Sequence, residues 1–214
     1  MINRLSMTAL MGCLVWCAVP RFAIGDLIII GINAEVSYID DRGLLLEGLL
    51  NIGDVVTGRY IYDSDTPDAN PSESAGLYWH YNAPYGLELT AGPYVFQTDP
   101  DYTEFFINVG NGTWDGYVLV SYNNLPLSNG VPVDHISWQL DDYSGMALSS
   151  DALPLGPPIL EDWEYDWGLR IELGPKGDTM VTADVTSVWL IPEPATVLLL
   201  GLGALGLLGI RRRG

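Results

Sequence analysis

Apolar and polar side chains alternate with a period of two along much of the chain between residues 26 and 190. In segments 136–141 and 181–186, every second side chain is apolar. This pattern is typical of β-strands that bury one face. After Ser187 the phase shifts, because Val188 and Leu190 are apolar, and this shift predicts a β-bulge. No stretch long enough for a soluble helix lacks glycine, proline or the alternation.

Further short segments rich in Val, Ile, Tyr and Trp are predicted strands. They are residues 27–39, 55–62, 76–81, 86–91, 105–109, 116–122 and 168–173. Turn-forming clusters separate them, at residues 63–74, 98–101, 110–112, 123–132 and 153–158. Many short strands divided by turns predict an all-β fold, specifically an antiparallel β-sandwich that is jelly-roll-like. Residues 26–190 are long enough for one such domain.

The first 25 residues predict a secretory signal peptide. Arg4 supplies the positive charge, and an apolar run follows from Leu5 to Val19. Ala23 and Gly25 have the spacing of a small-residue cleavage site, so Asp26 is the predicted first residue of the mature domain. The sequence therefore predicts export.

The predicted mature domain is strongly acidic. Residues 26–190 contain 26 acidic and four basic residues, which gives a net charge of −22. Such a charge repels nucleic acid and anionic lipid, so we predict no nucleic-acid partner, and it attracts cations. Cys13 and Cys17 both precede residue 26, which excludes disulfide bonds and thiolate chemistry in the mature domain.

Residues 191–214 contain three elements in order. The first is Pro192, Glu193 and Pro194; the second is the apolar segment 195–210; the third is Arg211, Arg212 and Arg213. At about 1.5 Å per residue, the apolar segment predicts a transmembrane helix of roughly 24 Å. The arginines are expected to stay in the cytoplasm, which leaves residues 26–190 on the other side of the membrane.

This arrangement resembles the PEP-CTERM signal, in which a Pro-Glu-Pro motif, one transmembrane helix and an arginine cluster end the chain. The resemblance implies that residues 192–194, together with Arg211, Arg212 and Arg213, form a sorting motif. It also implies that exosortase, a membrane cysteine transpeptidase or protease of bacteria that also make exopolysaccharide, recognises Glu193 and its flanking prolines. It also implies transient membrane anchoring and then a cell-surface or extracellular location. The blocks 63–68, 121–127 and 135–142 resemble uncharacterised PEP-CTERM surface proteins, which implies no activity. The alternative is an ordinary C-terminal membrane anchor.

Asp63, Asp65 and Asp68 form a predicted metal site. Three carboxylates at short spacing suit an oxygen-preferring cation such as Ca²⁺. The loop departs from the EF-hand pattern at Pro67 and Asp68. A plain exposed turn, which has the same composition, is the alternative. We predict no other cofactor.

Trp163, Tyr165 and Trp167 form a predicted sugar-binding site. They alternate with acidic residues, and aromatic rings stack on the faces of sugars. Glu161 and Glu164 are candidate carboxylates for a glycan-cleaving enzyme. A solvated acidic loop is the third interpretation.

The sequence offers few groups for other catalysis. Its two histidines, His80 and His135, both lie in strand-like segments, and neither G-x-S-x-G nor H-E-x-x-H occurs. We therefore predict a non-enzymatic surface or extracellular-matrix protein. The alternatives are a carbohydrate-binding module acting on exopolysaccharide and, third, a glycan-cleaving enzyme.

Overall fold

The computed structural model describes residues 27–174 and 177–192, and these form one antiparallel sheet of ten strands. The strands are β1 (Leu27–Asp41), β2 (Val55–Asp63), β3 (Ala75–His80), β4 (Gly86–Ala91), β5 (Tyr94–Gln97), β6 (Phe105–Asn111), β7 (Asp115–Ser121), β8 (Val133–Asp142), β9 (Tyr165–Leu173) and β10 (Thr179–Leu190). A short 3-10 helix, η1 (Leu160–Asp162), precedes β9, and the described residues contain no α-helix. The all-β prediction is therefore confirmed.

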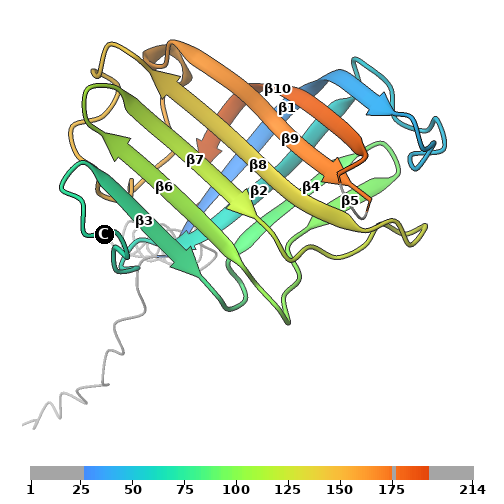
Figure 1. The fold of residues 1–214 in the computed structure, drawn as a ribbon, viewed down its shortest axis with the longest axis horizontal. Coiled ribbons are helices and arrows are strands. Elements are labelled where there is room, and N and C mark those ends of the chain that lie inside the picture. The colour runs from blue at the N-terminus through green and yellow to red at the C-terminus, as the bar shows by residue number, and fades with distance from the viewer. Residues whose placement is uncertain (1–26, 175–176, 193–214) are drawn as a thin grey trace, which may run out of the picture.

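The strand order is β3-β6-β7-β8-β9-β10-β1-β2-β4-β5. Figure 1 shows that the sheet curls, so that the front half (β3 and β6 to β9) faces the back half (β10, β1, β2, β4 and β5). A jelly-roll sandwich, as predicted from the sequence, would have two separate sheets. In this structure the ladder between β9 and β10 joins the two halves into one sheet, so the fold is a half-barrel.

The core lies between the two halves of the curled sheet. Tyr60 on β2, Tyr117 on β7 and Trp138 on β8 are all fully buried. The Tyr60 and Trp138 rings lie 6.4 Å apart, and the Tyr117 hydroxyl donates to the Tyr60 hydroxyl at 3.2 Å. β2 does not pair with β7 or β8 within the sheet, so these contacts span the core and hold the halves face to face.

Backbone hydrogen bonds close one side of the half-barrel. The Asp99 N–H donates to the Asn123 carbonyl and the Leu125 N–H donates to the Gln97 carbonyl, each at 2.8 Å. The end of the edge strand β5 thus pairs with the segment that follows β7. These bonds satisfy backbone groups that an open sheet edge would leave unpaired.

The loop between β8 and η1 covers a second opening. The Tyr62 hydroxyl donates to the Pro154 carbonyl and the Tyr78 hydroxyl donates to the Asp151 carbonyl, both at 2.8 Å. Leu153, between these two anchor points, is buried. The loop therefore completes the core between β2 and β3.

The predicted bulge near Ser187 is confirmed. Ser187 lies opposite Asn33, whereas Val185 lies opposite the next residue, Ala34, so Thr186 is the extra residue on β10. This irregularity explains why the alternation along β10 changes phase.

Both ends of the described domain leave the sheet at the same place. β1 and β10 are neighbours in the middle of the sheet and run antiparallel, with Ile30 opposite Leu190. The Ile191 N–H donates to the Ile29 carbonyl at 2.8 Å, and Pro192 follows directly and is exposed. The predicted sorting motif therefore begins with almost no linker after the last strand.

Several predictions fall outside the described residues. These are the signal peptide (1–25), the transmembrane helix (195–210) and the tail residues Glu193, Pro194 and Arg211 to Arg213. In the part of the chain that the structure describes, no helix is sufficiently long and apolar to cross a membrane.

Candidate functional site

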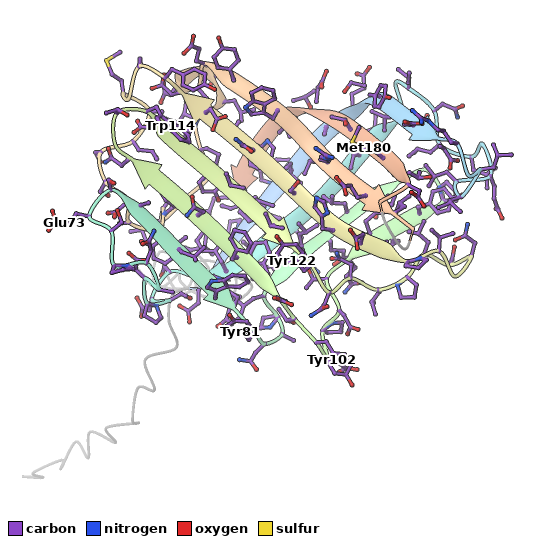
Figure 2. The ribbon with its side chains drawn as sticks, viewed as in Figure 1. Glu73, Tyr81, Tyr102, Trp114, Tyr122 and Met180 are labelled. Carbon is purple, nitrogen blue, oxygen red and sulfur yellow. The ribbon has the colours of Figure 1, made fainter. Side chains whose placement is uncertain are left out.

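Four exposed aromatic rings lie next to one another at one end of the front half of the sheet. We call Trp114, Tyr143, Tyr165 and Trp167 the rim row. Successive ring centroids are 6.2, 5.2 and 6.3 Å apart, and the exposed fractions of the four residues range from 44% to 57%. Figure 2 shows Trp114 at this end of the molecule. The rim row is thus a chain of half-exposed rings, of which Tyr165 and Trp167 are close to parallel at 24° while the other two neighbouring pairs are inclined by 52° and 62°.

Three neighbouring strands bring the rim row together. Trp114 directly precedes β7, Tyr143 directly follows β8, and the other two residues lie on β9. Asp115 is opposite Asp142, and Asp141 is opposite Tyr165, so the ends of these strands coincide. The pairing register therefore joins rings that are far apart in the sequence.

A bulge in β9 shapes the row locally. Trp138 lies opposite Leu169 while Leu140 lies opposite Asp166, so β9 has an extra residue next to Gly168. Gly168 has a φ of +73°, a backbone conformation that side chains disfavour, and a Cβ there would lie 2.7 Å from the Ala183 carbonyl oxygen. Glycine is therefore required beside Trp167.

Hydrogen bonds fix the orientation of the Trp167 indole. Its Nε1–H donates to Asp141 Oδ2 at 2.6 Å. Asp141 is itself buried and accepts two bonds from the Gln139 amide, at 2.9 and 3.1 Å. A ring held in this way loses little conformational freedom when a ligand binds.

A second carboxylate supports the same strand. Asp166 Oδ1 accepts bonds from the Trp138 indole N–H at 3.0 Å and from the Gly168 N–H at 2.8 Å. Burial raises the pKa of Asp166, because desolvation outweighs these two bonds. The charge on Glu164 raises the pKa of the Tyr165 hydroxyl, so this hydroxyl stays protonated and able to donate.

Only two of the three predicted sugar-binding residues belong to the rim row. Tyr165 and Trp167 do, whereas Trp163 is partly buried and packs against the core, with its ring 6.5 Å from Tyr117. Trp114 and Tyr143 complete the rim row, although the sequence does not predict them as binding residues. The available signal for Trp114 was a tryptophan between the predicted turn 110–112 and the predicted strand 116–122.

The candidate catalytic carboxylates Glu161 and Glu164 lie at exposed positions, the first in η1 and the second just before β9. These two carboxylates therefore do not lie in an enclosed site of the kind that glycan cleavage would use. The enzyme interpretation stays a hypothesis.

The aspartates of the predicted Ca²⁺ site have structural partners in the protein. Asp63 Oδ1 accepts the Asp65 N–H at 2.9 Å, and Asp68 Oδ1 accepts the Leu77 N–H at 2.8 Å. Asp68 thereby pairs with a backbone group on the edge strand β3. Ca²⁺ binding by this loop stays a prediction.

Another group of residues could hold a metal ion. Ligand atoms of Asp134, His135 and Glu172 lie within 4.8 Å of one another, the only such trio among the described residues. His135 Nδ1 lies 3.4 Å from Glu172 Oε2 and 3.7 Å from Asp134 Oδ2, and Arg170 also pairs with Glu172. The same geometry suits an ion pair with a protonated histidine.

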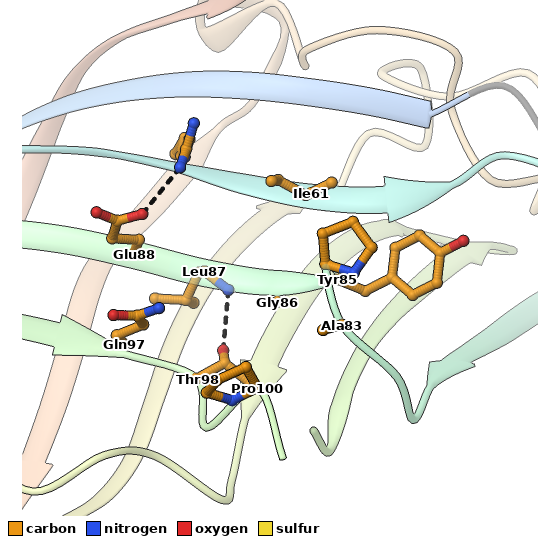
Figure 3. A pocket seen from close by; sticks show the side chains of 11 residues that line it. Ile61, Ala83, Tyr85, Gly86, Leu87, Glu88, Gln97, Thr98 and Pro100 are labelled. Atoms are coloured by element: carbon orange, nitrogen blue, oxygen red, sulfur yellow. Dashed lines mark hydrogen bonds and ion pairs between the residues drawn. The ribbon is translucent and has the colours of Figure 1, made fainter. Parts of the chain in front are cut away.

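A pocket of about 250 Å³ opens on the outer face of β2, β4 and β5 (Figure 3). Ile61 and Tyr85 line it, together with Arg59 and Glu88, whose side chains form an ion pair at 3.0 Å. Because these charges neutralise each other, the pocket offers a ligand little net electrostatic attraction.

Comparison with protein families identifies the tail. A family model described as the PEP-CTERM protein-sorting motif matches residues 190–213. Searches of curated proteins and of solved structures find no match to the chain. The molecule thus joins an antiparallel β domain to a sorting signal that begins on the last residue of β10. The chain thus carries a PEP-CTERM sorting motif over these residues, and the motif suggests exosortase-dependent sorting of an exported chain.

Proposed function

We propose that this protein is a non-enzymatic component of the cell surface or extracellular matrix. The signal peptide exports it, the tail holds it in the membrane for a time, and exosortase then releases or transfers it. The observation that carries this proposal is the sorting motif at residues 190–213, directly attached to the end of β10.

The short connection has a physical consequence. Four residues, 191–194, separate β10 from the predicted transmembrane helix, and a fully extended chain of this length spans only about 14 Å. The acidic domain is therefore expected to stay close to the membrane surface until the tail is cut.

The test is processing of the full chain in its native bacterium. We expect Glu193→Ala to leave an uncut tail in the membrane fraction, whereas the exposed loop variant Glu73→Ala behaves as the wild type. Loss of exosortase should reproduce the Glu193→Ala result. Equal processing of both variants and the wild type would refute the proposal.

The rim row favours a second candidate function, carbohydrate binding. Four half-exposed rings, with Trp167 held by Asp141, match the aromatic platforms on which the apolar faces of pyranose rings stack. The ligand class would be exopolysaccharide.

Retention of the protein on extracted exopolysaccharide tests this candidate. We expect Trp167→Ala to weaken retention and Tyr38→Ala, an exposed tyrosine outside the rim row, to leave it unchanged. No retention of the wild type removes the candidate. Release of reducing sugar that is lost in Glu164→Gln would favour the glycan-cleaving enzyme instead.

A further inference from the structure

A second series of aromatic rings crosses the outer face of the front half of the sheet. We call Tyr81, Trp79, Phe106 and Tyr122 the face row. The Trp79 and Tyr81 rings are 5.6 Å apart and within 3° of parallel. Phe106 lies 4.7 Å from Trp79 and 6.1 Å from Tyr122. The rings thus follow one another across β3, β6 and the residue after β7.

Strand alternation directs the face row outward. His80, Phe105 and Ser121, the neighbours of its members along the chain, are all buried in the core. Tyr81 and Tyr122 are 60% and 43% exposed, while Trp79 and Phe106 are partly buried and lie in the middle of the row. The solvent face of an antiparallel sheet is normally polar, so a cross-strand aromatic row there is more than the fold itself requires.

The Tyr122 end of the face row adjoins a polar hollow. The hollow encloses about 340 Å³, and its lining includes Tyr122, Tyr102, Asp99, Asn123 and Asp134. Figure 2 shows Tyr81, Tyr102 and Tyr122 near one another on the lower side of the molecule, away from Trp114 of the rim row. Hydroxyl, amide and carboxylate groups therefore stand beside the last ring.

This combination of flat rings and polar groups fits a sugar chain. The ring centroids are 4.7 to 6.1 Å apart, which is comparable to the size of one pyranose. The Trp79 and Tyr81 planes are parallel within 3°, whereas Phe106 is tilted by 48° to Trp79 and by 36° to Tyr122, so a sugar chain that crosses the row meets the later rings at an angle. Acceptors such as Asp99 and Asp134 can bind sugar hydroxyls, but they repel an anionic polymer. The chemistry thus selects an uncharged glycan.

We propose that the face row binds an uncharged polysaccharide chain, with pyranose faces stacked on the rings and hydroxyls hydrogen-bonded in the hollow beside Tyr122. This site is separate from the rim row. Its operation in the cell depends on the proposed export of the domain, but its affinity does not. A domain with two glycan sites can bind one polysaccharide chain more tightly than either site alone, because binding at one site raises the effective concentration of the same chain at the other.

The experiment uses the full chain in a detergent without a sugar headgroup. Retention is measured on amorphous cellulose, mannan, xylan and the exopolysaccharide extracted from the producing cells. We expect at least one uncharged polymer to retain the protein, and added salt to leave retention unchanged. No retention on any of the four, or retention by anionic polymers only, overturns the proposal.

Variants assign the binding to the face row. Tyr122→Ala and Trp79→Ala should each weaken binding about tenfold or more, with Tyr38→Ala unchanged. Because Trp79→Ala can also impair folding, Tyr81→Ser at an exposed position provides an independent variant, and circular dichroism checks each fold. If only Trp167→Ala weakens binding, the site is the rim row and the face-row proposal fails.

Tail processing is measured in the same variants. Normal processing with lost glycan binding supports the face row, whereas lost processing with normal binding refutes the sorting proposal alone. Specific capture of a protein by the face row, with no glycan retained, overturns the inference.

Discussion

The hydroxyl pair at the centre of the core allows a quantitative test of the curled sheet. The Tyr117 hydroxyl donates to the Tyr60 hydroxyl, and both rings are fully buried. In Tyr117→Phe, the Tyr60 hydroxyl loses this partner in an apolar environment. A buried polar group left unsatisfied costs about 1–3 kcal/mol of stability. Tyr60→Phe should cost a similar amount, because it removes the acceptor of the Tyr117 hydroxyl.

The double variant should be less destabilised than the sum of the two single variants. When both hydroxyls are removed, two apolar rings of nearly the same shape remain, and such a replacement is close to neutral. With the double variant close to the wild type, the expected coupling free energy has the magnitude of the two single losses added together, about 2–6 kcal/mol. This sign is specific to two hydroxyls that depend on each other.

Urea unfolding followed by tryptophan fluorescence measures these free energies. In thermal unfolding, each kcal/mol should shift Tm by about 2–4 °C for a domain of this size. Tyr38→Phe, at an exposed position on β1, is the matched control and should have no effect. Additive losses in the double variant would mean that the two hydroxyls are not paired across the core.

Three further predictions concern charge. Asp166→Asn should raise stability at pH 7, because burial raises the pKa of Asp166 and asparagine keeps the acceptor for Trp138. The gain should vanish below about pH 3.9, where the aspartate is protonated in both the folded and the unfolded chain. A loss of stability at pH 7 would contradict this prediction. Hydrogen bonds, first from the Met146 N–H and then from the Ser144 hydroxyl, lower the pKa of Asp142. Its stabilising effect is therefore present above about pH 3.9 and is lost as the pH falls through its lower folded pKa. Asp142→Asn should be less stable than the wild type at pH 7, and the difference should shrink as the pH falls below about 3.9. Sodium chloride should raise Tm by screening the net charge of −22, and a larger rise with CaCl₂ at equal ionic strength, lost in Asp63→Asn, would support the Ca²⁺ prediction.

The local features of the fold could be predicted from the sequence because alternation reports which face of a strand is buried. Alternation identified β8, β10 and the bulge near Ser187, and richness in Val, Ile, Tyr and Trp identified seven further strands, so that nine of the ten were predicted. The strand Tyr94–Gln97 was missed because it has only four residues, directly after Gly92 and Pro93. Alternation says nothing about which strand lies beside which, so the continuous sheet could not be distinguished from a sandwich.

The candidate site was predicted only in part for the same reason. Tyr165 and Trp167 are close in sequence and were found together. Their ring neighbours Trp114 and Tyr143 reach them through the register of three strands, which the sequence does not reveal. Trp163 is flanked by acidic residues just as Tyr165 is, but its side chain packs against Tyr117 of the core.

Mass spectrometry of the mature chain from native cells is the most direct test of sorting by the tail. If the tail directs sorting, we expect a chain that begins at Asp26, lacks the arginine cluster 211–213 and is recovered from the cell surface or the medium. An intact chain that still ends at Gly214 and is recovered from the cytosol would contradict the account.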